Sequence, residues 1–140
     1  MRAVLTDTGF WLGLLDPVDG HHDEAFALAG LLENEVVVFP FPCLYETLRT
    51  RLVRRRDALM QLEAILSRPK INLFPDEAYR DKALFNLLEN ARSFGFTYSL
   101  ADCVIREMLL DVNLGIGHFI TFNPGDFSDV CAIRGIEILP

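Results

Sequence analysis

This sequence lacks several features that would place a protein in an easily recognised class. Its 140 residues include only three cysteines, Cys43, Cys103 and Cys131, at wide spacings. An odd number of scattered cysteines argues against a disulfide framework and against a zinc ribbon. We therefore expect a reduced, cytoplasmic protein.

Long hydrophobic runs are also missing. The apolar stretches are far shorter than the roughly 20 residues that a membrane helix needs. The N-terminus has no basic region followed by an apolar segment and a cleavage site, so we expect no signal peptide. Because 51% of the residues are hydrophobic, the chain can bury a core, and its length predicts one domain over residues 1–140.

Positive charge is scarce. The chain has 13 Lys and Arg against 20 Asp and Glu, and its net charge is −7. Such a surface does not attract nucleic acid unless cations are recruited or basic residues are clustered. A cluster does exist, consisting of Arg49, Arg51, Arg54, Arg55 and Arg56. It is either a phosphate-contacting patch or the solvated face of a helix whose long side chains cover apolar neighbours.

Motifs of several other phosphate-handling proteins are absent. Gly115 and Gly117 precede a predicted strand, so they do not form a phosphate loop between a strand and a helix. A phosphatase that uses an aspartate nucleophile would need an acid two residues after Asp7, where this chain has Gly9. These absences exclude the simplest nucleotide-binding and phosphatase interpretations.

What the sequence does contain is a regular alternation of short apolar strands and helices. We predict strands at residues 3–6, 36–39, 71–74, 118–121 and 136–139. We predict helices at residues 8–15, 23–34, 42–66, 76–93 and 99–113, with Asp76 capping the fourth. This alternation is typical of an α/β fold with a parallel sheet covered by helices on both faces. Ligands of such sheets bind at the carboxyl ends of the strands.

Oxygen-bearing side chains gather at this predicted edge. Asp7 follows the first strand, and Glu46 lies near the start of the helix after the second strand. Asp102 begins the helix before the fourth strand, which is followed by Asn123 and Asp126. Such oxygens are the ligands that Mg²⁺ prefers, and they leave room for waters and a phosphate oxygen. The set therefore predicts metal-dependent cleavage of a phosphodiester.

Taken singly, each of these residues has a plainer explanation. Asp7 fits a turn or a helix cap, and Asp102 fits the acidic position of a capping box. Glu46 could form a surface ion pair with Arg49, and Asn123 before a proline is a common turn initiator. Only their joint placement at one sheet edge favours a site.

Four stretches, taken in order, resemble the PIN-domain family, and most closely the toxin ribonucleases of VapBC-type toxin–antitoxin pairs. They are LTDTGFWLGLLD, FPCLYETL, SLADCVIREML and ITFNPGDF. The resemblance covers essentially the whole chain. It implies a three-layer α/β/α sandwich with a five-stranded parallel sheet in the order 3-2-1-4-5. It also implies an endoribonuclease that depends on Mg²⁺ or Mn²⁺.

The resemblance assigns roles by position. Asp7, Glu46 and Asp102 match the three core acids of the family, and the fourth acid matches Asn123. An amide oxygen can ligate a cation but contributes no charge, so a second metal should bind more weakly than the first. Asp126 matches the second acid of the final motif and is expected to stand in. On this pattern Asp7 and Asp102 hold the main metal, and Glu46 positions a water molecule or a second metal.

The resemblance also implies further contacts. Thr8 and Thr121 match hydroxyl positions near the pocket, and with Arg49 they are candidates for substrate binding. The expected partners are an RNA substrate, a cognate antitoxin whose tail covers the active-site groove, and a second copy of the chain in a homodimer. The arginine cluster could also dock an acidic segment of such a partner. The alternative is a catalytically weak PIN-like module that binds protein or nucleic acid, supported by Asn123 and the acidic composition.

Two aromatic features remain open at this point. Phe10, Trp11 and Leu14 belong either to the core or to a homodimer face. The adjacent His21 and His22 point apart on a helix, so we expect surface residues and not a shared metal site.

Overall fold

Five parallel strands form one sheet, in the order β3-β2-β1-β4-β5, in the computed structural model, which describes residues 2–95 and 98–140. The strands are β1 Ala3–Thr6, β2 Val37–Pro40, β3 Ile71–Phe74, β4 Ile116–Ile120 and β5 Glu137–Leu139. All four pairings are parallel, and Leu5 of the central strand lies between Val38 and Phe119. The predicted strand order and the predicted α/β class are confirmed.

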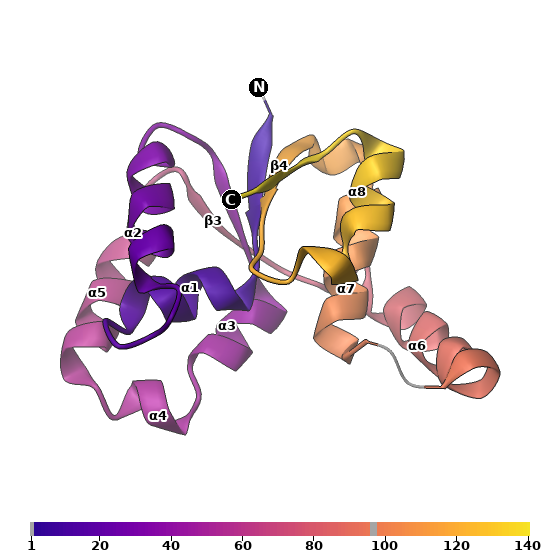
Figure 1. The fold of residues 1–140 in the computed structure, drawn as a ribbon, viewed down its shortest axis with the longest axis horizontal. Helices are drawn as coiled ribbons and strands as arrows, with labels where there is room; N and C mark the ends of the chain where they lie inside the picture. Colours follow the sequence, from indigo (N-terminus) through magenta and orange to yellow (C-terminus); the bar gives the residue numbers. More distant parts are fainter. Residues whose placement is uncertain (1, 96–97) are drawn as a thin grey trace.

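Helices cover both faces of the sheet. They are α1 Thr8–Leu15, α2 His22–Leu31, α3 Phe41–Thr47, α4 Thr50–Val53, α5 Arg56–Leu66, α6 Arg80–Phe94, α7 Leu100–Leu110 and α8 Ser128–Arg134. Short 3-10 turns, η1 Val112–Leu114 and η2 Pro124–Asp126, flank β4. Figure 1 shows α1, α2 and α5 on one side of the sheet and α7 and α8 on the other, while α6 projects from the body. The three-layer sandwich is therefore confirmed.

The central strand is buried because its neighbours cover it completely. All four residues of β1 are buried, as a parallel strand covered on both faces requires. Trp11 stacks on Phe39 with 4.3 Å between ring centroids, and its indole Nε1 donates to Thr6 Oγ1 at 2.9 Å. Thr6 Oγ1 in turn donates to the carbonyl oxygen of Val38 at 2.8 Å, so the buried polar atoms are satisfied. Phe10, with 1% exposure, and Trp11, with 2%, therefore belong to the core and not to a dimer face.

The single helix predicted over residues 42–66 is wrong. The chain instead forms α3, α4 and α5, separated by non-helical backbone at Leu48 and Arg49 and again at Arg55. The Thr47 hydroxyl donates to the carbonyl oxygen of Cys43 at 2.6 Å, a local bond that competes with regular helix. Arg55 Nη1 donates to Asp16 Oδ1 at 2.8 Å, so a tertiary ion pair holds the second break. Periodicity cannot detect such a break, because the leucine spacing continues through it.

Several other boundaries differ from the predictions. The helix predicted from Asp76 begins at Arg80, because residues 76–79 form a turn in which the Asp76 carbonyl accepts the amides of Tyr79 and Arg80. Asp76 therefore does not cap α6. The predicted break after residue 93 falls at Gly95, where φ is +78°, and Phe96 lies outside the described residues.

Several large apolar side chains of the helices do not reach the core. Phe26 and Leu31 of α2 are exposed. Leu84 and Leu88 of α6 are exposed as well, because this helix packs on α7 with one face and otherwise projects from the body. The helix predicted to end at residue 113 stops at Leu110, and α8 was not predicted.

The state of the cysteines and the length of the helices can be compared with the sequence. Cys43, Cys103 and Cys131 are free and buried. Among the helices of the described residues, none is both long enough and apolar enough to cross a membrane.

Candidate active site at the carboxyl edge of the sheet

Asp7 stands where β1 ends. Its amide donates to the carbonyl oxygen of Ile120 at 3.1 Å, which continues the ladder between β1 and β4. Its Oδ1 accepts the amide of Thr8 at 2.8 Å and so caps α1, while its Oδ2 accepts Thr121 Oγ1 at 3.0 Å. The cap and the site are therefore the same carboxylate, buried to 8% exposure at the carboxyl edge of the sheet.

Thr121 fixes the other side of this carboxylate. It follows β4 directly, is buried, and donates its amide proton to the Leu139 carbonyl at 3.1 Å. Besides donating to Asp7, its hydroxyl oxygen accepts the amide of Asn123 at 3.0 Å. The hydroxyl predicted near the pocket thus links the end of β4 to Asp7 and shapes the loop that follows.

Glu46 reaches the site from α3, which packs against α1 and α7. Its Oε1 accepts the Thr8 hydroxyl at 2.7 Å. The possible ion pair with Arg49 is not formed, because Arg49 Nε donates to the backbone carbonyl of Glu46 at 3.1 Å. Thr8 therefore joins two acids, with its amide on Asp7 and its hydroxyl on Glu46.

Asp102 enters at the start of α7 as part of a complete capping box. Its amide donates to Ser99 Oγ at 3.1 Å, and its Oδ2 accepts the Ser99 amide at 3.4 Å. Asp102 is therefore the acidic residue of a capping box, as its sequence position suggested. Capping also orients the carboxylate, since the capping box attaches it to the end of the helix that faces the acids.

Glu46 lines a pocket together with Leu100 and Ala101 at the start of α7, the helix that carries Asp102. The pKa of Asp7 is raised from its ordinary value near 3.8 to about 6, first by burial and then by the negative charges of Asp102 and Glu46. The hydrogen bonds from Thr8 and Thr121 oppose this change, since they favour the charged form. Asp7 is therefore still mainly ionised at neutral pH, but its charge destabilises the fold, and a positive charge beside it would relieve that cost.

A thiol completes the wall of the site, and sequence reasoning missed it. Cys43 is fully buried, with its Sγ 3.8 Å from the Thr6 carbonyl oxygen and 4.0 Å from Asp7 Oδ1. Burial raises the pKa of this thiol far above its usual range, and the charge of Asp7 adds to the effect. The group is thus a neutral thiol and no nucleophile. Its position three residues before Glu46, one helical turn away, was the available signal.

The donor set fits a hard divalent cation. Within residues 2–95 and 98–140, no lysine or arginine forms an ion pair with the carboxylate of Asp7, Glu46 or Asp102. In the same residues, no three His, Cys, Asp or Glu side chains form a ready cluster for a metal ion. An ion held by one or two carboxylates and several waters, as Mg²⁺ usually is, needs no such cluster.

The remaining predicted ligands lie at the margin. Asn123 is exposed, and Asp126 ends η2, where its backbone carbonyl accepts Arg106 Nη1 at 2.7 Å. The charges that raise the pKa of Asp7 are those of Asp102 and Glu46. The structure thus joins Asp7 to Glu46 through Thr8, places the start of α7 with Asp102 beside Glu46, and leaves the loop of Asn123 and Asp126 at the margin.

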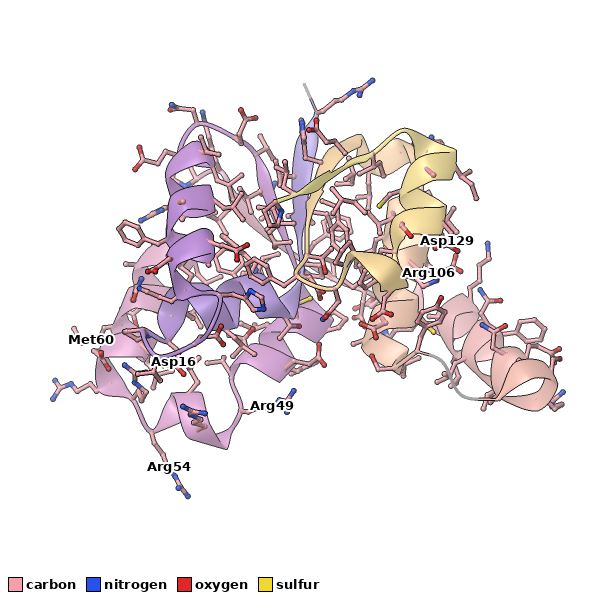
Figure 2. All side chains as sticks on the ribbon, viewed as in Figure 1. Asp16, Arg49, Arg54, Met60, Arg106 and Asp129 are labelled. Atoms are coloured by element: carbon pink, nitrogen blue, oxygen red, sulfur yellow. The ribbon has the colours of Figure 1, made fainter. Side chains whose placement is uncertain are left out.

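The arginine cluster borders this site on one side. A pocket of about 230 Å³ next to Glu46 is lined by Arg49, Arg51 and Arg55 together with Asp16. Figure 2 shows Arg54 directed away from the body, and Arg49 in the segment between α3 and α4. Arg55 is partly buried and committed to Asp16, whereas the Arg51 side chain is 80% exposed. The cluster is therefore divided into a structural arginine and exposed ones.

Solved structures share this architecture over nearly their whole length. VapC20 from Mycobacterium tuberculosis, described as a sarcin-ricin loop cleaving toxin, superposes with a TM-score of 0.72 at 23% identity, covering 99% of this chain and 100% of that one. The chain has the PIN-domain fold. No family model matches the sequence, and no curated protein matches it significantly.

Two further PIN-fold matches come from different bacteria. VapBC2 from Rickettsia felis, solved with a DNA fragment from its promoter, matches with a TM-score of 0.64 at 15% identity, covering 99% of this chain and 98% of that one. FitAcB from Neisseria gonorrhoeae matches with a TM-score of 0.64 at 17% identity, covering 98% and 96%. In this PIN fold, Asp7 occupies the end of the central strand.

Proposed function

We propose that this protein is a metal-dependent endoribonuclease that hydrolyses RNA phosphodiester bonds, and the toxin of a type II toxin–antitoxin pair. The observation that carries the proposal is the buried Asp7 carboxylate at the carboxyl edge of the sheet, joined to Glu46 through Thr8 and acted on by the charges of Glu46 and Asp102. The full-length likeness in fold to a toxin described as cleaving the sarcin-ricin loop supports it.

The metal would be Mg²⁺ or Mn²⁺, bound mainly by Asp7 and Asp102. Glu46 would complete the site, and Asn123 and Asp126 would add ligands from the loop after β4. Such an ion supplies positive charge for the reacting phosphate and lowers the pKa of a bound water molecule. The missing charge at Asn123 favours one metal over two.

The residues around the acids act by holding them. Thr121 and the Thr8 amide bind the two oxygens of Asp7, so this carboxylate cannot rotate. The Thr8 hydroxyl directs Glu46 toward the same edge. Since Thr8 and Thr121 already use their hydroxyls in this way, their first role is to orient acids, and contact with substrate comes second.

RNA would approach over the exposed arginines. A net charge of −7 repels a polyanion, so local positive charge must offset it. Arg49, at the pocket beside Glu46, is the nearest candidate for a phosphate contact. The same exposed side chains would accept an acidic segment of an antitoxin.

The proposed partners follow from the same likeness. VapBC2 was solved on a DNA fragment from its promoter. For this chain we propose a cognate antitoxin, a homodimer, and action in the cytoplasm.

A cleavage assay tests the proposal. Purified protein is incubated with single-stranded and structured RNA in Mg²⁺ or Mn²⁺, with chelator and with Asp7→Asn as controls. Endonucleolytic products that vanish in both controls are the expected result. Intact RNA under all metal conditions would contradict the nuclease assignment.

The second candidate function is a PIN-like module that binds protein or nucleic acid without cleaving it. The amide at Asn123 favours it, because that position lacks the charge of a fourth acid. RNA binding that persists in chelator, without cleavage in metal, would establish this alternative.

A further inference from the structure

Two aromatic rings from distant segments stack beside the acids. The imidazole of His21 and the ring of Phe122 are 4.2 Å apart between centroids and only 5° from parallel. His21 precedes α2, and Phe122 follows β4. Since 101 positions separate them in the sequence, the pair exists only in the folded chain.

The pair lies next to the candidate active site. Phe122 directly follows Thr121, whose hydroxyl holds Asp7. Its ring also lies over the first turn of α1, where a Cβ built on Gly9 would be 3.5 Å from Phe122 Cδ2. Asp7 caps that same turn, so the stacked rings and the carboxylate lie on one end of α1.

His21 is held in place by its backbone. Its amide donates to Asp19 Oδ1 at 2.8 Å, and its carbonyl oxygen accepts the amide of Ala25 at 2.9 Å. The loop also packs tightly on α1, because a Cβ on Gly13 would come within 3.3 Å of the His21 carbonyl oxygen. The backbone beneath the imidazole is therefore ordered before any ligand arrives.

The imidazole nevertheless remains accessible. About half of the His21 side chain, 51%, is exposed, although one face rests on Phe122. Its Nδ1 lies 3.8 Å from Glu24 Oε1. A flat ring that is backed on one face and open to solvent suits stacking by another flat ring.

We propose that His21 and Phe122 form a base-stacking platform that holds a nucleobase of single-stranded RNA beside the scissile phosphate. This inference rests on the proposed function, which makes RNA the substrate. Proteins that recognise unpaired RNA stack its bases on aromatic side chains, histidine included. Stacking requires no positive charge, so it offers an acidic protein a source of affinity that repulsion does not cancel.

The first test measures binding without cleavage. In the Asp7→Asn background with Mg²⁺, a short single-stranded oligoribonucleotide carries the fluorescent analogue 2-aminopurine at successive positions. Stacking quenches its emission, and we expect quenching at one or two adjacent positions. Adding His21→Ala should remove the quenching and weaken binding by about 5-fold to 100-fold, whereas His21→Tyr should restore both.

Two further variants provide controls. Phe122→Leu keeps apolar volume over α1 but removes the planar support, so it should reduce the quenching. His118→Ala removes an imidazole on β4 that pairs with Glu137 and does not belong to the stacked pair, so it should change nothing. Equal melting temperatures of His21→Ala and His21→Tyr would exclude a merely structural effect.

The second test is kinetic and uses otherwise unaltered protein. The platform should act on substrate binding, so His21→Ala should raise KM for a short single-stranded RNA more than it lowers kcat. If His21→Ala behaves like the parent in both quenching and KM, or if no base is quenched at all, the platform is wrong. If quenching depends on His21 but the parent protein cleaves no RNA, the platform stands as an RNA-binding site and the nuclease proposal fails.

Discussion

Two carboxylates, Asp129 and Asp7, show what distinguishes a structural ion pair from a candidate site. Asp129, on α8, is bound by both terminal nitrogens of Arg106 from α7, at 2.8 and 2.7 Å (Figure 2). This ion pair holds the pKa of Asp129 below its ordinary value. Asp7 instead has a pKa raised to about 6, through burial and two neighbouring acids.

The difference lies in what the chain provides for each acid. Asp16 has Arg55, and Glu107 has Lys82 at 3.5 Å and Asn86 at 2.7 Å. Within the described residues, Asp7 is contacted by the Thr8 amide, the Thr121 hydroxyl and the Cys43 thiol, which are neutral donors that orient a carboxylate without neutralising it. Asp129, Asp16 and Glu107 are each paired with a cation of the chain, whereas Asp7, Glu46 and Asp102 form no ion pair within the described residues.

The largest effect should come from removing a charge at the unpaired acids. Asp7→Asn and Asp102→Asn should each lower RNA cleavage by at least about 100-fold, because the metal loses a charged ligand. Gel-based cleavage at saturating Mn²⁺ measures this. Asp129→Asn is the matched control and should cleave at the parent rate. Loss of cleavage in that variant too would erase the distinction between the two acids.

The second effect is a gain in stability, whereas most mutations lower the free energy of unfolding. Raising the pKa of Asp7 from 3.8 to about 6 corresponds to about 3 kcal/mol against the folded state when the carboxylate is ionised. Because the folded pKa is the higher one, this penalty is absent below about pH 4 and complete above about pH 6. Asp7→Asn should therefore stabilise the protein by about 2–3 kcal/mol at pH 7.5.

Urea unfolding in chelator at pH 7.5 and at pH 4 measures the difference in free energy of unfolding between Asp7→Asn and the parent, which should vanish at pH 4. Adding Mg²⁺ at pH 7.5 should also reduce this difference, because the ion stabilises only the parent protein. An Asp7→Asn variant that is less stable than the parent at both pH values would show that the ionised Asp7 carboxylate does not destabilise the folded state.

The third prediction concerns the structural pair. Arg106→Ala removes two bonds to Asp129, one to the Asp126 carbonyl, and a stacking contact 4.6 Å above Tyr98. We expect it to lower the free energy of unfolding by about 1–2 kcal/mol, while the rate of RNA cleavage stays within about twofold of the parent rate. Thermal denaturation followed by circular dichroism measures the loss. A stable but inactive variant would place Arg106 in the site.

The fourth prediction distinguishes the role of Thr8, which orients the Glu46 carboxylate, from the role of Glu46 itself. Thr8→Val removes the hydroxyl that donates to Glu46 Oε1 at 2.7 Å but keeps the shape of the side chain. Cleavage should fall by about tenfold, less than for Glu46→Gln, because the carboxylate is still present but no longer directed. Thr8→Ser should restore the rate. Full activity of Thr8→Val would show that Glu46 needs no positioning.

The smallest effect distinguishes the two roles of Asp102. Ser99→Ala breaks the capping box and should cost about 1 kcal/mol of stability with little effect on cleavage. Asp102→Asn should instead lower cleavage with little effect on stability, because an amide oxygen can still accept the Ser99 amide. Comparing the melting temperature and the cleavage rate of both variants measures this. Identical profiles would mean that Asp102 is a cap and nothing more.

Much of this architecture could be read from local pattern. The strands were predicted within about one or two residues, because short β-branched and aromatic runs between turn residues leave few alternatives. Asp7, Glu46 and Asp102 were predicted together because all carboxyl ends of a parallel sheet meet at one edge. The helix over residues 42–66 failed because the leucine spacing persists across two breaks, the second of which is held by Asp16, a residue from another segment.

By itself, the sequence determined the α/β class and the placement of the acids along the chain, since both depend on periodicity and on which residues follow each strand. Only the tertiary structure decided which acids have a cation beside them, because that depends on contacts between segments. Arg106 binds Asp129 and Arg55 binds Asp16, whereas the neutral donors of Thr8, Thr121 and Cys43 contact Asp7. The stacking of His21 on Phe122 is of the same kind. No local pattern encodes it, because two loops distant in sequence meet only when α1 and β4 are both in place.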